Sequence, residues 1–260
     1  MRTVLITSSH QRHRWVAAAL LQAGLAGVVI EEKPSIGLSR EGTVDPRVST
    51  YLAERAGREA QWFARAPKTY AELGVPLCQV AWGGSNSDDV FRFVAGLSPD
   101  RVALFGSSII RDPLLSRFAG SIINMHLGLS PYYRGSATNF WPLVHGLPEC
   151  VGVTLHHATL RVDGGHVLGQ RRPPVVADDG SHDLGCKAII EGAVLMADLL
   201  SRDRLSEGRP QVGAGVLCRR SDFTPESIDD LHMRLRSGML TRYIEDKRRR
   251  DERYPIVDNL

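Results

Sequence analysis

The residues of this sequence best suited to chemistry are a side-chain amide and an imidazole, Asn124 and His126, which follow a short apolar run at 121–123. If that run is a strand, side chains two residues apart point to the same face, and both groups project where the strand ends. Two polar groups aimed at one point can stabilise the negative oxygen of a tetrahedral adduct. We therefore predict that Asn124 and His126 are catalytic.

A carboxylate further along the chain completes the predicted set. Asp163 lies in a Val-Asp-Gly-Gly turn. A free histidine titrates near about 6.5 and is only partly charged at neutral pH, and a nearby carboxylate favours its charged form, so Asp163 could set the charge state of His126. It could also relay protons from an attacking amine through water. Taken separately, each of the three residues is more often structural.

Elements that could position these residues follow from the hydrophobic pattern. Continuous apolar runs alternate with stretches of helical periodicity, which is typical of an α/β fold. We predict a Rossmann-like, mostly parallel sheet with helices on both faces. The predicted strands are 3–7, 27–30, 75–80, 101–106, 121–126, 151–157 and 167–176. The predicted helices are 14–23, 48–65, 87–97, 113–118, 183–200 and 225–250, with a loop at 31–48.

A change of composition near residue 202 predicts a boundary. Glycines and a proline are concentrated in 202–215, which indicates a linker. The predicted division is therefore a catalytic domain over 1–202 and a linker with a short helical C-terminal extension over 203–260. The sequence leaves open whether that extension forms a homodimer, closes over the site or packs on the core.

Bulk composition limits the classes of partner. The chain has 260 residues, of which 43% are hydrophobic and 23% charged, with a formal charge of +3. This mild charge suits an anionic substrate but does not require nucleic acid. The N-terminal apolar stretch is too short for a signal peptide, and no run approaches the roughly 20 apolar residues of a membrane span. The four cysteines form no metal-type pair. We expect a cytoplasmic protein with reduced thiols, no membrane partner and no nucleic acid.

Beyond these single residues, the motif Asn-x-His-x-x-Leu-x-Pro-x-x-Arg-Gly, followed by Gly-x-Thr-x-His and Val-Asp-x-Gly, resembles the folate-dependent formyltransferases. That family includes glycinamide ribonucleotide, methionyl-tRNA and sugar N-formyltransferases. The resemblance is strongest over residues 100–175. The matching residues are Asn124, His126, Leu129, Pro131, Arg134, Gly135, Gly152, Thr154, His156, Val162, Asp163 and Gly165. The sequence departs from the family pattern at Gly128 and Ser130, which leaves the geometry of that loop open.

The resemblance implies the formyltransferase fold and one-carbon transfer from N10-formyltetrahydrofolate to an amine, with no metal. By carry-over, Asn124 and His126 hold the oxyanion and Asp163 assists proton transfer. The implied folate pocket is formed by two segments, in which backbone groups recognise the pterin and apolar side chains wall it. Its residues are Gly106, Ser108, Ile109, Ile110, Leu160, Arg161 and Val162. Ile109 and Ile110 are equally consistent with ordinary core.

The turn after the first predicted strand discriminates between acceptors. The purine-pathway enzyme has a glycine-rich turn there that holds a ribose phosphate at a helix N-terminus. This chain has no glycine there but a basic cluster of His10, Arg12 and His13. The cluster would hold a phosphate or carboxylate, or would simply be a solvated basic turn. The missing glycine argues against glycinamide ribonucleotide as the acceptor.

Other members of the family differ at their ends. The methionyl-tRNA enzyme has a C-terminal β-barrel for RNA and the deformylase has an extra N-terminal domain, and this sequence predicts neither. A small-molecule amine remains, and we favour a nucleotide-linked amino sugar. The segment after the motif proline, with Tyr133, Arg134 and Gly135, is the predicted acceptor site, where Tyr133, Phe140 and Trp141 would stack on a sugar or base or pack internally.

Two readings from other classes remain. His126, His156, Asp163 and His166 could ligate zinc in a hydrolase. His157 follows His156 directly, so in a strand the two face opposite ways, and no His-Glu-x-x-His helix is present. A non-catalytic binding module would not need the amide, the imidazole and the carboxylate together.

Overall fold

The computed structural model describes residues 1–33 and 45–258. The strands are β1 (Thr3–Ser8), β2 (Leu25–Glu32), β3 (Leu77–Ala81), β4 (Arg101–Leu104), β5 (Ile122–Leu127), β6 (Tyr133–Gly135), β7 (Val153–His157), β8 (Val167–Arg171) and β9 (Val216–Cys218). The helices are α1 (Gln11–Ala19), α2 (Pro46–Trp62), α3 (Asp88–Gly96), α4 (Leu114–Arg117), α5 (Trp141–Val144), α6 (Ser181–Ser201), α7 (Pro225–Arg236), α8 (Met239–Glu245) and α9 (Lys247–Glu252). Every predicted strand is present, although the last ends at Arg171 rather than 176. Most of the predicted loop at 31–48 lies outside the described residues.

The main sheet is mostly parallel, as predicted. Its seven strands lie in the order β3-β2-β1-β4-β5-β7-β8. The pairs from β3 to β5 are parallel, whereas β7 runs antiparallel to both β5 and β8. Since the chain order reverses between β1 and β4, the crevice at the carboxyl ends of these strands is where open α/β sheets bind ligands.

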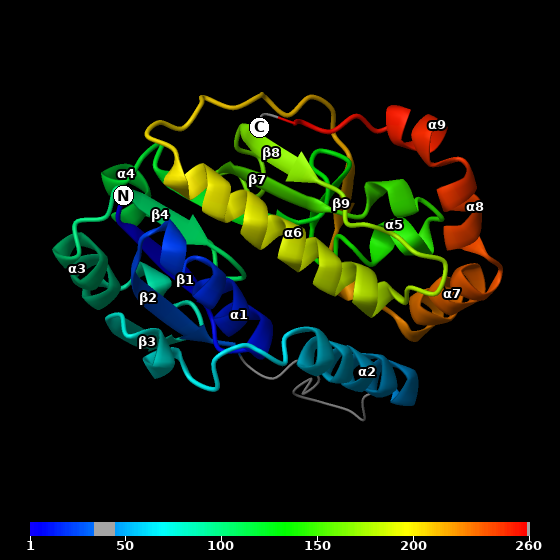
Figure 1. Ribbon diagram of the computed structural model, residues 1–260, viewed down its shortest axis with the longest axis horizontal. Coiled ribbons are helices and arrows are strands. Elements are labelled where there is room, and N and C mark those ends of the chain that lie inside the picture. The colour runs from blue at the N-terminus through cyan, green and yellow to red at the C-terminus, as the bar shows by residue number, and fades with distance from the viewer. Residues whose placement is uncertain (34–44, 259–260) are drawn as a thin grey trace.

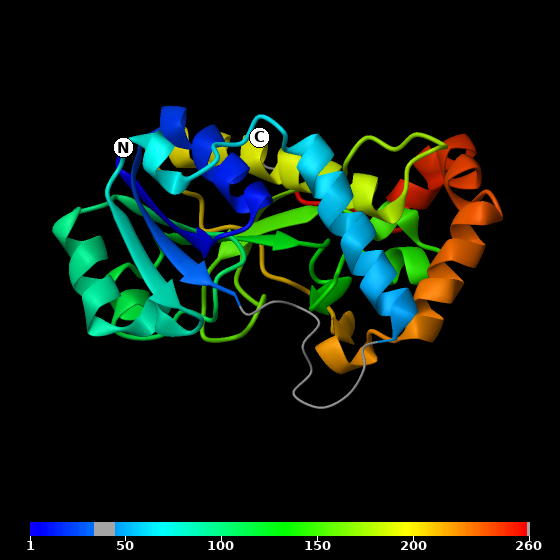
Figure 2. The ribbon, with the colours of Figure 1, turned by 90° about the horizontal axis from the view of Figure 1, so that it is seen from below.

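Helices cover both faces of this sheet. Figure 1 shows α1 and α6 crossing one face, and Figure 2 shows α3 and α4 on the opposite side. Side chains of β1 alternate accordingly. Leu5 joins the hydrophobic cluster under α1 and α6, whereas Val4 and Ile6 join the cluster under α3 and α4. Strands buried on both faces explain why the sequence shows continuous apolar runs.

The predicted single helix over 225–250 is wrong. The segment forms α7, α8 and α9, and the first break falls at Gly238, whose φ of 77° is left-handed. A residue in that conformation ends a helix, and glycine adopts it without steric cost.

The C-terminal helices pack on the rest of the chain. Ile228 and Leu231 of α7 share a hydrophobic cluster with Tyr51 of α2, Leu143 of α5 and Leu184 of α6. In Figure 1 these helices lie beyond the end of the sheet, next to α5. Of the three roles left open for this extension, packing on the core is the one that these contacts describe.

A small second sheet was not expected from the sequence. β6 and β9 pair in parallel, with Tyr133 opposite Val216 and Gly135 opposite Cys218. Each strand has three residues, too few to display a pattern. Gly135 has a φ of 94°, and a Cβ there would lie 2.3 Å from the carbonyl oxygen of Cys218, so this pairing requires glycine.

Two further expectations concern the whole chain. Among residues 1–33 and 45–258, no helix combines the length and apolar character that a bilayer span requires. All four cysteines are free thiols, of which Cys78 is half-buried and the others are buried.

Candidate active site

The predicted oxyanion pair lies on β5 as expected. Asn124 and His126 share one face of the strand, and the antiparallel neighbour β7 places His156 opposite Asn124 and Thr154 opposite His126. Directly opposed residues of an antiparallel pair project to the same face. The fold therefore places four polar side chains together on two adjacent strands.

Asp163 joins this group from the loop after β7. Its Oδ1 lies 3.4 Å from Nδ1 of His126 and 3.7 Å from Nε2 of His156. Its Oδ2 accepts a hydrogen bond of 3.2 Å from the backbone N–H of Gly135 on β6. The structure thus brings together Asn124, His126 and Asp163, which sequence analysis predicted as one set.

The turn that carries Asp163 is unusual. Asp163 itself has a φ of 48°, in the left-handed region that few residues other than glycine, asparagine and aspartate adopt. A Cβ on Gly165 would lie 1.8 Å from the carbonyl oxygen of His157, so the chain returns to β8 in close contact with the end of β7. The Val-Asp-Gly-Gly sequence therefore meets a geometric requirement of this turn.

Asp163 is ionised at neutral pH. Burial by itself raises the pKa of this carboxyl, but the facing imidazoles of His126 and His156 and the N–H of Gly135 outweigh burial and lower the pKa to about 2. The site therefore holds a fixed negative charge next to both histidines.

Asp163 favours the charged form of His126, as expected, but it does not keep the ring protonated at neutral pH. His126 is 7% exposed, and its burial lowers the pKa of the ring by more than the nearby carboxylate raises it. The ring is therefore neutral above pH 6.5. Oxygen atoms lie beside both of its nitrogens: Nδ1 is 3.4 Å from Oδ1 of Asp163, and Nε2 is 3.4 Å from the carbonyl oxygen of Tyr133 and 3.3 Å from Oγ1 of Thr138. These neighbours suit a ring that takes up a proton when negative charge develops nearby.

His156 is a part of the site to which sequence analysis gave no catalytic role. Its Nδ1–H donates to the carbonyl oxygen of His157 at 2.8 Å, which leaves Nε2 to accept from the amide of Asn124 at 3.0 Å. That bond orients the amide and leaves its second N–H free to donate. The sequence marked His156 only as a residue of the motif. The pairing of β5 with β7 was needed to show that His156 lies opposite Asn124.

The loop in which this sequence departs from the family pattern is well anchored. The hydroxyl of Thr154 donates to the carbonyl oxygen of Gly128 and accepts from the N–H of Ser130. A Cβ on Gly128 would lie 2.7 Å from Cβ of Thr138 and 3.0 Å from Nε2 of His126. Glycine at this position therefore lets the Thr138 side chain pack against the ring of His126.

The first predicted folate segment follows β4. Ser108 donates from its N–H and its hydroxyl to the carboxylate of Glu31, at 2.6 and 2.7 Å, and Glu31 is fully buried at the end of β2. Ile109 is 48% exposed, whereas Ile110 lies in the core. Gly106, with a φ of 69°, packs over the ring of His13. Only Ile109 is thus left to form an apolar wall here.

The second predicted segment carries exposed apolar side chains. Leu160 is 74% exposed and Val162 52% exposed, while the stem of Arg161 packs over Gly164. Ala158, which precedes this segment, packs against the same hydrophobic cluster that contains Ile110 of the first segment. Exposed apolar side chains in adjoining loops are typical of a ligand site, and the residues fit a flat apolar ring system.

The basic turn after β1 is largely engaged within the protein. Arg12 pairs with Glu59 at 2.6 Å and is nine-tenths buried. His13 is buried, with Nδ1 2.8 Å from the hydroxyl of Thr7, and burial lowers its pKa well below the usual value. His10 is half-buried, and burial followed by the charge of Arg12 lowers its pKa. The structure therefore does not bring the three basic side chains to one open surface.

The predicted acceptor segment lies on β6. Tyr133 is buried, and its hydroxyl bonds to Nδ1 of His145 at 2.8 Å. Arg134 donates to the carbonyl oxygen of Ala214. Gly135 contacts the carboxylate of Asp163 through its N–H, and the carbonyl oxygen of Tyr133 lies 3.4 Å from Nε2 of His126.

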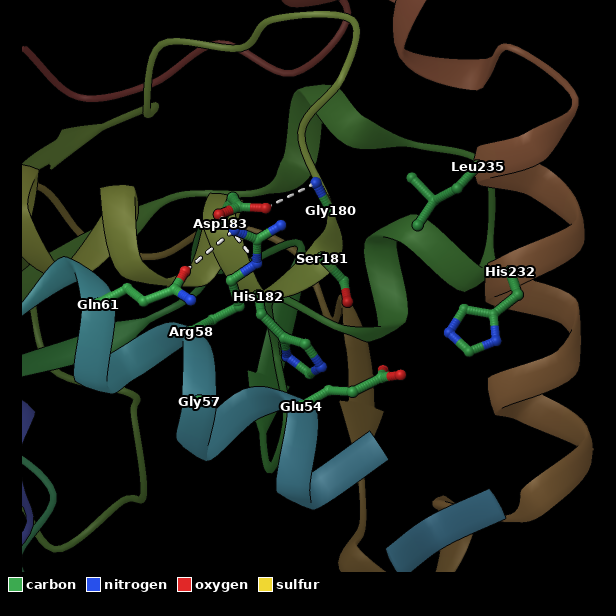
Figure 3. A pocket seen from close by; sticks show the side chains of 10 residues that line it. All are labelled: Glu54, Gly57, Arg58, Gln61, Gly180, Ser181, His182, Asp183, His232 and Leu235. Carbon is green, nitrogen blue, oxygen red and sulfur yellow. Dashed lines mark hydrogen bonds and ion pairs between the residues drawn. The ribbon is translucent and has the colours of Figure 1, made fainter. Parts of the chain in front are cut away.

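A cavity of about 420 Å³ lies apart from these residues, between α2, the start of α6 and α7 (Figure 3). Two of its charged groups are already paired: Asp183 accepts from the indole of Trp62 and the N–H of Gly180, and lies 3.7 Å from Arg58. None of the predicted site residues lines it.

The zinc hypothesis finds no support in the geometry. Within the described part of the chain, no group of three or more histidine, cysteine, aspartate or glutamate side chains is arranged to hold a metal ion. His157 and His166 instead bond to the carbonyl oxygens of Ser206 and Glu207.

Comparison with known proteins shows similarity to formyltransferases. A family model described as formyl transferase matches residues 28–196. The phosphoribosylglycinamide formyltransferase of Anaplasma phagocytophilum is 17% identical, with a TM-score of 0.57 over 84% of this chain and 98% of that one. A sugar N-formyltransferase from a Shewanella species is 17% identical, with a TM-score of 0.56 over 90% of this chain and 88% of that one. An N-formyltransferase of Helicobacter canadensis, solved with folinic acid and dTDP-3-aminofucose, is 14% identical, with a TM-score of 0.55 over 88% of this chain and 79% of that one.

Proposed function

Because this chain belongs to the formyl transferase family and is a folate-dependent N-formyltransferase, we propose that it formylates the primary amine of a nucleotide-linked amino sugar. N10-formyltetrahydrofolate is the donor, and it supplies an activated formyl carbon. The observation that carries the reaction is the meeting of Asn124, His126 and Asp163 at one point of the fold.

The roles of these residues follow from their contacts. Asn124 donates one amide hydrogen to His156 and directs the other at the formyl oxygen. As the amine nitrogen bonds to the formyl carbon, the neutral ring of His126 takes up the proton that the amine loses. Asp163, ionised and 3.4 Å from His126, relays this proton through water and stabilises the imidazolium. The proton then passes to N10 of tetrahydrofolate as the bond between N10 and the formyl carbon breaks.

The donor would lie against the two loops that follow β4 and β7. Ile109, Leu160 and Val162 supply apolar contacts for the pterin ring, and the backbone of Gly106, Ser108 and Arg161 supplies hydrogen-bonding groups. Glu31 holds the first of these loops in place through Ser108.

The choice of an amino sugar rests on the turn after β1. A ribose phosphate bound there would need free backbone and side-chain donors. Arg12 is instead paired with Glu59, and His13 is buried against Thr7. These contacts support an acceptor that does not bind its phosphate at the turn after β1. We place the amine of the acceptor near Tyr133, Arg134 and Gly135 instead. The enzyme is proposed to act in the cytoplasm without nucleic acid, and sedimentation would test the possible homodimer.

The assay follows release of tetrahydrofolate from N10-formyltetrahydrofolate with a panel of amines. Release that requires a nucleotide-linked amino sugar supports the proposal. Release with glycinamide ribonucleotide would identify the purine-pathway activity, and release without any amine would identify a deformylase. Asn124→Ala should lower turnover by about 10²- to 10³-fold, the usual effect of removing one oxyanion donor.

A further inference from the structure

The segment at 206–218, of which residues 206–215 belong to the predicted linker, runs beside the turn of Asp163. Its backbone is tied to β7, β8 and β6 at several points. Arg209 and Val167 exchange two backbone hydrogen bonds of 2.8 Å. Val216 donates to the carbonyl oxygen of Tyr132 at 2.8 Å, and β9 then pairs with β6. We name residues 206–218 the strap.

One side chain of the strap contacts the catalytic turn directly. The amide nitrogen of Gln211 donates to the carbonyl oxygen of Asp163 at 2.7 Å and to that of Gly165 at 2.8 Å. Both amide hydrogens are therefore used on the two residues that flank Gly164. The Oε1 of Gln211 is buried and accepts no hydrogen bond from any described residue. A flipped amide would place the side-chain oxygen of Gln211 against two carbonyl oxygens. These two acceptors therefore determine the orientation of the amide.

The turn needs an external restraint. Asp163 has a φ of 48°, and a left-handed residue other than glycine costs about 1–2 kcal/mol unless its surroundings hold it. The direction of the Asp163 carboxylate depends on this backbone. A change of φ would carry Oδ1 away from His126, from which it is separated by 3.4 Å.

The carboxylate end of Asp163 depends on the same strap. Oδ2 accepts from the N–H of Gly135, and the position of Gly135 is set by its pairing with Cys218 of β9. The strap thus reaches Asp163 at its backbone through Gln211 and at its side chain through β6.

We infer that Gln211 is a positioning residue, which holds the turn of Asp163 so that the carboxylate faces His126. This inference rests on the catalytic role proposed for Asp163. Gln211 acts through two donated hydrogen bonds and touches neither the donor nor the acceptor. The segment expected to join two domains therefore forms part of the active-site framework.

Two variants separate hydrogen bonding from shape. Gln211→Met keeps the length of the side chain and removes both donors. Gln211→Glu keeps the shape but presents oxygens to the two carbonyl groups. Gln22→Glu is the matched control, because Gln22 is exposed and has no hydrogen bond to another described residue.

Turnover and donor binding are measured in each variant, the second with folinic acid as the probe. We expect kcat to fall by about 10- to 100-fold in both Gln211 variants, since misplacing a catalytic group by about 1 Å has an effect of that order. The dissociation constant for folinic acid should change by less than about threefold, a split that general unfolding would not produce. The control should match the wild type.

A second measurement needs no substrate. The imidazole signal of His126 is titrated by NMR and assigned with His126→Gln. The carboxylate of Asp163 raises the pKa of His126, so a displaced Asp163 in Gln211→Met should lower that pKa further. Backbone hydrogen exchange over 163–167 should also accelerate in the variant.

The outcomes distinguish this inference from the proposed function. A wild-type kcat in both variants, or a wild-type pKa of His126 and wild-type exchange in Gln211→Met, would overturn the role of Gln211. If the wild-type enzyme transfers formyl to none of the amines, the proposed function fails. The NMR and exchange results would still decide whether Gln211 positions Asp163. If Gln211→Met does not fold, the exchange and turnover of Gln211→Glu carry the test.

Discussion

Replacing Asp163 with asparagine removes the fixed negative charge of the site while keeping the size of the side chain. In the wild type this carboxyl titrates at about 2 instead of 3.8. A shift of one pKa unit corresponds to about 1.4 kcal/mol, so the folded state favours the ionised form by about 2 kcal/mol more than water does. The side chain is only 11% exposed, and solvent screening reduces this value little.

Both stability and turnover should respond to Asp163→Asn. A carboxyl with a lowered pKa stabilises the fold above its unfolded pKa, and this contribution is lost as the pH falls through the folded pKa. The wild type should therefore be about 2 kcal/mol more stable than the variant near pH 4, and the difference should disappear as the pH falls from 4 to 2. Turnover should fall by about 10²- to 10⁴-fold, the usual contribution of general acid–base catalysis.

The assays are urea unfolding as a function of pH and release of tetrahydrofolate with the acceptor that the panel identifies. Asp178→Asn is the matched control, because Asp178 is exposed and no hydrogen bond or ion pair joins it to the described residues. Near-normal turnover of Asp163→Asn would refute the catalytic role of Asp163. A stability difference that persisted at pH 2 would refute the electrostatic explanation.

Three further predictions concern the framework of the site. Gly135→Ala should destabilise the fold by more than about 1 kcal/mol in urea unfolding, because the residue is left-handed and the new Cβ would lie 2.3 Å from the carbonyl oxygen of Cys218. Glu31→Gln should weaken binding of folinic acid by at least about tenfold, measured by calorimetry. Hydrogen bonds to a charged group contribute about 1.5–3 kcal/mol, and two of the bonds that Glu31 accepts hold Ser108. An unchanged affinity for folinic acid would contradict this role of Glu31. Burial lowers the pKa of His182 to about 4, so the wild type should lose stability as the pH falls from 6.5 to 4, where the unfolded chain binds the proton first. His182→Gln should show a flatter pH profile over that range, and an unchanged slope would exclude this origin.

Local sequence patterns predicted much of the fold. Strands buried on both faces, such as β1, appear as apolar runs because each side chain meets a helix layer. The shared face of Asn124 and His126 follows from the two-residue repeat of a strand and needs no tertiary information. The break at Gly238 was visible as a glycine, but the whole of 225–250 was predicted as one helix.

Tertiary structure decided what surrounds those residues. The charge of His126 depends on its burial, which outweighs the carboxylate of Asp163, and no local pattern records how much water a side chain loses. The pairing of β6 with β9 and the hydrogen bonds of Gln211 join segments far apart in the chain. Sequence alone therefore determined which groups are present and which face they occupy. Only the packed chain determined their distances and protonation, because both depend on atoms contributed by distant residues.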